Sequence, residues 1–302
     1  MRVGVVILPA ARWADSAAAW RLVDDLGFAH AWTFDHVVWR ELADRPWFAA
    51  VPTLAAAAVV TRRIRLGTLV CTPNFRHPVP LAKEAMTLDD MSGGRFVLGV
   101  GAGAAGVDDT VIADRPWPAA ERADRFAEFV ALTDHLLRHQ VTHFTGRHYR
   151  ADAIPMWPGC VRRPRLPLAV AATGPRGIRL AARYADVWVT NGTPRGPGTA
   201  APVTTAERVR TQVAELARAC DAIGRDPAGL AKLVVLADRD TSPLASVDAF
   251  VDTLDRYAAA GVTDVVVPLP RREPPFAGDL AVLERVATEV LPGLPSAGLP
   301  SW

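Results

Sequence analysis

Asp35 and His36 stand next to each other directly after a short apolar run at residues 31–34. A carboxylate beside an imidazole can donate or accept a proton near neutral pH. The same two side chains could instead cap the segment that follows, so the pair alone does not identify an active site. Trp39 follows His36 by three residues, where an aromatic side chain could cover a bound molecule.

Two segments rich in small residues are further candidates for contact with a ligand. Glycines alternate at 99, 101 and 103, and small residues let a ligand approach the backbone closely. A tight turn without a ligand would have the same composition. Thr173 and Gly174 precede a predicted helix with Arg176 in its first turn, where free amides can bind a phosphate. Ordinary helix capping would produce the same pattern.

The cysteines and histidines do not show the spacing of a metal site or a nucleophilic centre. Three cysteines are an odd number without a CxxC pair, which argues against a disulfide framework and a zinc site. Cys71 could be a nucleophile, but no histidine can be placed beside it, and an inert buried thiol is the favoured interpretation. The histidines lack an HExxH or similar spacing, so no metal is expected.

Length and charge restrict the class of protein. The chain has 302 residues, half of them apolar, with 34 Lys and Arg against 32 Asp and Glu. This composition favours a globular protein and argues against nucleic acid or an anionic membrane surface as the main partner. The N-terminal residues lack a signal-peptide layout, and no apolar run approaches the length of a membrane span. We therefore expect a cytoplasmic protein.

Apolar runs alternate with segments of helical spacing along the chain. The runs read as continuous apolar segments, which is typical of parallel strands buried on both faces. They lie at 3–8, 31–34, 64–71, 96–101, 168–172, 187–190, 233–237 and 262–269. The predicted helices lie at 15–26, 51–61, 80–91, 119–139, 174–184, 205–223, 243–260 and 279–290.

This alternation predicts a single α/β domain over 1–302 that forms a closed (β/α)8 TIM barrel. A doubly wound open sheet is the alternative, but a GxGxxG motif is absent after the first strand. An insertion at 104–166 separates the fourth and fifth strands, and its alternating residues 141–150 predict a hairpin. We expect this insertion beside the barrel mouth, as a lid or as a structural excursion. The segments 191–203 and 293–302 are expected to be loops.

Three segments carry a resemblance to a known family. They are GFAHAWTFDHV at 27–37, RIRLGTLVCTPNFRHPVPLAKEAMTLDDMSGGRFVLGVGAG at 63–103 and GPRGIRLAARYADVWVTNG at 174–192. They resemble the bacterial luciferase-like family of flavin- and deazaflavin-dependent oxidoreductases, whose members are (β/α)8 barrels. The Asp-His pair looks like the branch that binds the deazaflavin coenzyme F420. The resemblance implies that His36 is a catalytic acid or base, or a polar group on the substrate side. It also implies that Asp35 contacts the cofactor and belongs to the catalytic residues.

The resemblance also implies which residues contact the cofactor and the substrate. A non-proline cis peptide is expected at Leu69-Val70, where it would support the ring of the cofactor. The implied cofactor contacts are Asp35, Leu69, Val70, Thr72, Gly101, Ala102, Gly103, Thr173, Gly174 and Arg176, and the implied substrate pocket includes Trp39, Cys71 and Ala104. Family members often carry Thr at position 102 and an acidic or aromatic residue at 104 and 105. Their replacement by Ala leaves His36 as the only acid or base that we name.

These observations predict an oxidoreductase that uses reduced F420 to transfer a hydride to, or from, a small organic substrate. One alternative is an FMN-dependent monooxygenase that uses O2. A second alternative is a flavin-binding protein without catalytic activity. The family resemblance also implies a homodimer.

Overall fold

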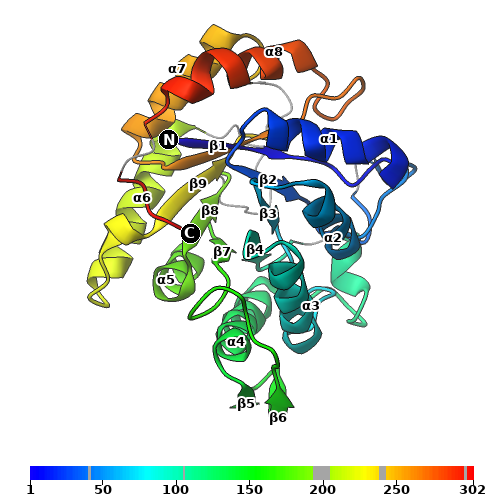
Figure 1. The fold of residues 1–302 in the computed structure, drawn as a ribbon. Helices are drawn as coiled ribbons and strands as arrows, with labels where there is room; N and C mark the ends of the chain where they lie inside the picture. Colours follow the sequence, from blue (N-terminus) through cyan, green and yellow to red (C-terminus); the bar gives the residue numbers. More distant parts are fainter. Residues whose placement is uncertain (40–41, 105, 193–204, 238–242, 296–297) are drawn as a thin grey trace.

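A computed structural model describes residues 1–39, 42–104, 106–192, 205–237, 243–295 and 298–302. In this part of the chain, eight parallel strands form a closed barrel (Figure 1). They are β1 (Arg2–Val6), β2 (His30–Thr33), β3 (Arg65–Thr68), β4 (Phe96–Gly101), β7 (Leu168–Ala171), β8 (Val187–Thr190), β9 (Ala231–Val235) and β10 (Asp264–Pro268). Strands follow one another in sequence order, and β10 pairs with β1. The predicted TIM barrel is confirmed, and the open sheet is wrong.

Helices surround the barrel on its outer face (Figure 1). They are α1 (Trp13–Asp25), α2 (Ala50–Val60), α3 (Pro78–Met91), α4 (Ala119–Arg138), α5 (Pro175–Tyr184), α6 (Ala206–Asp221), α7 (Val247–Ala259) and α8 (Leu280–Arg285). Gly27 after α1 and Gly261 after α7 have φ values of 83° and 85°. This left-handed conformation ends a helix at little cost only when the residue lacks a side chain. None of the described helices is both long enough and apolar enough to cross a membrane.

The strands are apolar on both faces because each face packs into a separate core. Val3 and Val5 of β1 contact the layer between barrel and helices, whereas Val6 belongs to a second cluster. That second cluster contains strand residues, Leu69 directly after β3 and Trp302 but no helix residue, so it fills the barrel interior. Burial on two sides explains why the strands appear in the sequence as continuous apolar runs.

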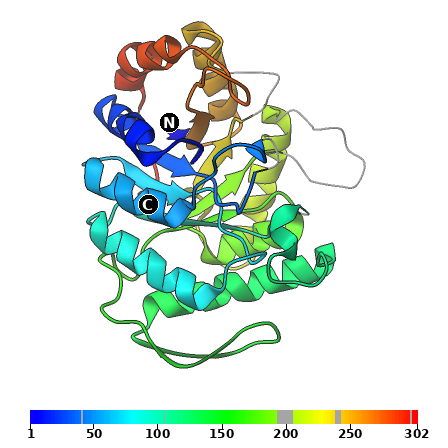
Figure 2. The same cartoon turned by 90° about the vertical axis from the view of Figure 1, so that its right-hand side faces the viewer.

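The segment between β4 and β7 contains α4 and a hairpin formed by β5 (Val141–Thr145) and β6 (Arg150–Pro155). The hairpin lies over the outer side of α3 and α4, as both views show (Figures 1 and 2). Lys83 of α3 donates to the carbonyl oxygens of Pro155 and Trp157 at 3.3 and 3.0 Å. The expectation that the whole insertion lies at the barrel mouth is therefore wrong for the hairpin. Its apolar residues instead cover α4, where Phe129 contacts Tyr149.

The end of the chain closes the amino-terminal end of the barrel. Trp302 is 2% exposed and lies beneath the guanidinium groups of Arg2 and Arg65, which begin β1 and β3. Arg2 also forms two hydrogen bonds to Asp264, at 2.6 and 2.8 Å. Because this end is filled, a ligand can enter the barrel only from the carboxyl ends of the strands. Of the loop predicted at 191–203, residues 193–203 lie outside the described residues.

Candidate active site

Asp35 lies at the carboxyl end of β2 and is paired with an arginine that the sequence analysis did not identify. Arg76, from the segment between β3 and α3, donates to both carboxylate oxygens of Asp35 at 2.7 and 3.0 Å. Burial lowers the pKa of Arg76, but the hydrogen bonds and charge of Asp35 outweigh this effect and raise it. Asp35 is 1% exposed, so the pair holds β2 and β3 together at the barrel mouth.

His36 is held by Asp108, a second residue that the sequence analysis missed. Asp108 lies on a short turn, Val107–Thr110, that follows β4. Its Oδ2 lies 2.5 Å from Nδ1 of His36, and its Oδ1 accepts a hydrogen bond from the backbone N–H of Val37 at 2.9 Å. When Asp108 is ionised it only accepts hydrogen bonds, so Nδ1 of His36 is then the donor. Nε2 has no hydrogen-bond partner among the described residues and can exchange a proton with a substrate.

Aromatic side chains form a wall beside His36. Trp47 donates its indole N–H to the carbonyl oxygen of His36 at 2.9 Å. Trp39, the predicted substrate contact, lies between Trp47, Phe34 and Phe276, with ring centroids 5.7, 5.4 and 5.9 Å away. Phe276 comes from the loop after β10, so loops that are distant in sequence meet at this wall. Large aromatic faces can bind a planar or apolar part of a ligand.

The ends of β3 and β4 approach each other unusually closely. The peptide bond between Leu69 and Val70 is cis, at the position that the family resemblance implied. A Cβ atom at Gly101 would lie 2.5 Å from Cγ2 of Val70, and one at Gly99 would lie 1.9 Å from the carbonyl oxygen of Thr68. Glycine is therefore required at both positions of β4.

Two polar groups near these strand ends are buried without a partner. Oγ1 of Thr72 and Oδ1 of Asn74 form no hydrogen bond with a described residue. Asn74 donates through Nδ2 to the carbonyl oxygen of Ala104 at 3.1 Å and lies against Gly103, whose φ is 74°. Buried polar atoms are normally satisfied, so these two are candidates for contact with a ligand at this edge. Asn74 was not predicted, although it lies two residues from Thr72.

The amino terminus of α5 has the expected free amides, but Arg176 is already paired. Gly174 is the N-cap residue and provides no capping side chain, and the space around its Cα is open. The carbonyl oxygen of Thr173 accepts a hydrogen bond from Gln212 at 3.1 Å, which holds this turn in place. Arg176 forms an ion pair with Asp124 of α4, and both side chains are largely exposed. The backbone of this turn, more than Arg176, is suited to a phosphate.

Cys71 and Ala104, which were both expected in the substrate pocket, differ in their burial. Cys71 is completely buried and packs in the layer between barrel and helices, so the expectation that it lines the pocket is wrong. Burial also raises the pKa of its thiol well above the usual value, which makes it a poor nucleophile. Ala104 and Ala102 are half-buried on the loop after β4.

Among the described residues, no group of three His, Cys, Asp or Glu side chains could hold a metal ion.

Comparison with known proteins identifies relatives over the full barrel. A family model described as luciferase-like monooxygenase matches residues 1–268. An uncharacterized protein of Mycobacterium tuberculosis is 31% identical over 311 residues, which cover 96% of this chain and 99% of that protein. An F420-dependent glucose-6-phosphate dehydrogenase of Beutenbergia cavernae is 36% identical over 173 residues, which cover 56% of this chain and 49% of that protein.

Solved structures show the same fold. The coenzyme F420-dependent tetrahydromethanopterin reductase of Methanopyrus kandleri superposes with a TM-score of 0.77 at 19% identity. The alignment covers 96% of this chain and 98% of that protein. At this identity, the likeness concerns the architecture of the barrel and not the ligand.

Proposed function

Because the chain belongs to the luciferase-like monooxygenase family, we propose that it is an oxidoreductase that uses F420 to transfer a hydride to or from a small organic substrate. The observation that carries this proposal is the fixed imidazole of His36, which has Asp108 on one nitrogen and no described partner on the other. The F420-dependent dehydrogenase among its relatives supports the choice of cofactor.

The residues at the barrel mouth fit a planar cofactor with polar edges and a phosphate. Thr72 and Asn74 offer buried polar atoms that lack hydrogen-bond partners among the described residues, and Gly101 and Gly103 let Val70 and Asn74 lie close against β4 and its loop. The amides at the start of α5 would hold the phosphate. Leu69, Val70 and Ala102 would contact the ring, while Asp35 would act through its ion pair with Arg76.

The role of the protein in this reaction is to position both partners and to move one proton. When bound, F420 supplies the carbon centre that carries the hydride. In substrate oxidation, Nε2 of His36 accepts the proton of the substrate hydroxyl group as the hydride leaves the adjacent carbon. In reduction, the protonated ring returns that proton to the carbonyl oxygen. Asp108 holds the ring and stabilises its positive charge in both directions.

Binding measurements test this proposal directly. Trp39 and Trp47 lie beside His36, so their fluorescence should fall when a flavin-type ring binds. We expect F420 to quench this fluorescence with much higher affinity than FMN, each titrated in oxidised and reduced form. A preference for reduced FMN would instead support an O2-dependent monooxygenase, which the description of the family also favours. If neither F420 nor FMN binds, the proposal is wrong.

The His36→Ala variant separates an enzyme from a flavin-binding protein without activity. Loss of the proton-transfer group should lower turnover about 100-fold or more. Cofactor affinity should change little, because the proposed cofactor contacts lie on β3, β4 and α5. A variant that retains full turnover would contradict the role of His36.

The proposal extends to a homodimer in the cytoplasm. The homodimer is supported by apolar residues exposed on helices beside the early strands, namely Val59 of α2, which is 72% exposed, and Met91 of α3, which is 43% exposed. Analytical ultracentrifugation of the purified protein would measure its mass in solution.

A further inference from the structure

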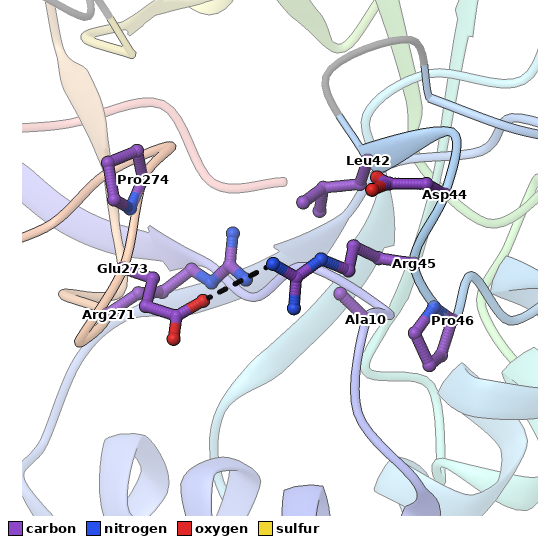
Figure 3. Close-up of a pocket in the computed structure, with 8 residues that line it drawn as sticks. All are labelled: Ala10, Leu42, Asp44, Arg45, Pro46, Arg271, Glu273 and Pro274. Carbon is purple, nitrogen blue, oxygen red and sulfur yellow. Dashed lines mark ion pairs between the residues drawn. The ribbon is translucent and has the colours of Figure 1, made fainter.

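A small polar cavity lies at the rim of the barrel mouth, between the loops that follow β1, β2 and β10 (Figure 3). Each loop contributes to its wall, including Ala10, Arg45 and Arg271. Its volume of about 210 Å3 suits one functional group of a ligand more than a whole ligand. Arg45 lies two residues before Trp47, which binds the carbonyl oxygen of His36, so the cavity adjoins the active site.

Two guanidinium groups face each other across this cavity. The side chains of Arg45 and Arg271 extend toward one another from opposite loops (Figure 3). Glu273 approaches Arg45 at 3.9 Å, but both side chains are largely exposed, so this pair contributes little. Asp44 also lines the cavity, and its carboxylate lies beside Leu42 (Figure 3). Glu273 is therefore the nearest anion, but among the described residues neither guanidinium group donates a hydrogen bond to a carboxylate.

Arg271, unlike Arg45, forms no ion pair with a carboxylate of the described residues. Its guanidinium group donates one hydrogen bond, from Nη1 to the carbonyl oxygen of Pro275 at 3.3 Å. No ion pair within 4.0 Å joins it to a carboxylate in the described part of the chain. Burial lowers the pKa of Arg271, and the charge of Arg45 lowers it further against the attraction of Glu273. A partly buried cation with unused donors is stabilised when an anion binds beside it.

We propose that this cavity binds an anionic group, a carboxylate or a phosphate, of the substrate that reacts at His36. A guanidinium group matches both anions in geometry, because its parallel N–H donors can bind two oxygens at once. The link to His36 rests on the proposed function, whereas the anion site itself does not. The substrate class is then an alcohol or carbonyl compound that carries an acidic group.

The aromatic wall connects the cavity with His36. Phe276 accepts a hydrogen bond at its carbonyl oxygen from the backbone N–H of Arg271 at 2.9 Å. Its ring stacks on Trp39 with an angle of 24° between the planes. A substrate bound at both ends would therefore lie along the faces of Trp39 and Phe276. This arrangement favours a planar or apolar segment between the acidic group and the reacting carbon.

Calorimetric titration of the cofactor-free protein with inorganic phosphate and with benzoate tests the anion site. We expect at least one of these probes to bind, and Arg271→Gln and Arg45→Gln to weaken that binding about tenfold each. The identity of the probe that binds distinguishes a phosphate site from a carboxylate site. Arg150→Gln is the matched control, because Arg150 is 75% exposed on the distant hairpin and should leave binding unchanged. Thermal melting would verify that all variants are folded.

Two results would overturn this inference. One is the absence of binding for both probes to the unmodified protein, and the other is equal binding in all variants. Because no cofactor is present, these results are independent of the F420 titration. Anion binding that depends on Arg271 in a protein that does not bind F420 would refute the proposed function and retain the anion site.

Discussion

Asp35 and His36 are neighbours in the chain, yet their partners give them different tasks. Both oxygens of Asp35 accept hydrogen bonds from Arg76, so the whole carboxylate takes part in an ion pair. The imidazole of His36 is hydrogen-bonded through Nδ1, and its Nε2 has no partner among the described residues. At the scale of single residues, we therefore propose the acid and base function for His36 and a positioning role for Asp35 and Asp108.

Replacing Asp108 by Asn should lower kcat about 100-fold, because an amide of the same size cannot stabilise a positively charged imidazole. F420 affinity should stay the same, since Asp108 contacts His36 and the backbone of Val37. Steady-state kinetics measures the first effect, and nitrogen NMR of the histidine ring reports whether its tautomer changes. Asp114→Asn, an exposed carboxylate of the same loop, is the control. An equal loss of kcat in both variants would contradict the role of Asp108.

At the scale of elements, the mouth depends on how closely β4 approaches β3. Thr68 donates its hydroxyl to the carbonyl oxygen of Gly99 at 2.9 Å and accepts from the N–H of Gly99 at 3.0 Å. These bonds are possible because Gly99 has no side chain between the two strands. The same closeness brings the ends of β3 and β4, and so Thr72 and Gly101, to one edge of the barrel.

Gly99→Ala should lower the stability of the protein, whereas Gly174→Ala should mainly weaken F420 binding. A methyl group at Gly99 would lie 1.9 Å from a backbone oxygen that cannot move aside, so we expect a loss of about 3 kcal/mol or more in the free energy of unfolding. A methyl group at Gly174 meets no atom within 4 Å, so stability should change by less than about 1 kcal/mol. It should nevertheless weaken F420 binding, because it occupies the proposed phosphate position. Urea unfolding and fluorescence titration measure the two effects, and comparable stability of both variants would contradict this account.

At the scale of the whole molecule, the two ends of the barrel have different tasks. The carboxyl ends of the strands carry His36, its partners and the polar cavity. The amino-terminal end is filled by Trp302, Arg2, His30 and Asp264, which join β1, β2 and β10 to the end of the chain. Burial lowers the pKa of His30. A charged and aromatic network therefore closes the barrel opposite the active site.

This closed end predicts how stability depends on acid pH. Burial raises the pKa of Asp264, but the adjacent His30 and the hydrogen bonds from Arg2 outweigh it and lower the pKa from 3.8 to about 2. Between these pH values the unfolded chain binds more protons, so the folded state loses stability as pH falls. The contribution is about 2 kcal/mol, is complete above a pH of about 4 and disappears near pH 2. Urea unfolding at several pH values should show that Asp264→Asn removes this dependence, and an unchanged dependence would contradict it.

The barrel and the position of His36 could be predicted from the sequence because both depend on local patterns. Strands buried on two faces are continuous apolar runs, and helices between them have their own period. His36 follows such a run directly, so its place at a strand end required no knowledge of distant residues. The cis bond at Leu69-Val70 was located by family resemblance, since no local pattern in the sequence identifies it.

The partners of these residues were decided by the tertiary structure alone. Arg76 reaches Asp35 across 41 residues, and Asp108 reaches His36 across 72, because loops that follow different strands converge at one end of a closed barrel. The same convergence brings Arg45 and Arg271 to one cavity. Cys71 was misplaced because its sequence position shows the strand but not the face that it occupies. Local periodicity determines which elements form, whereas the meeting of side chains depends on how the barrel closes.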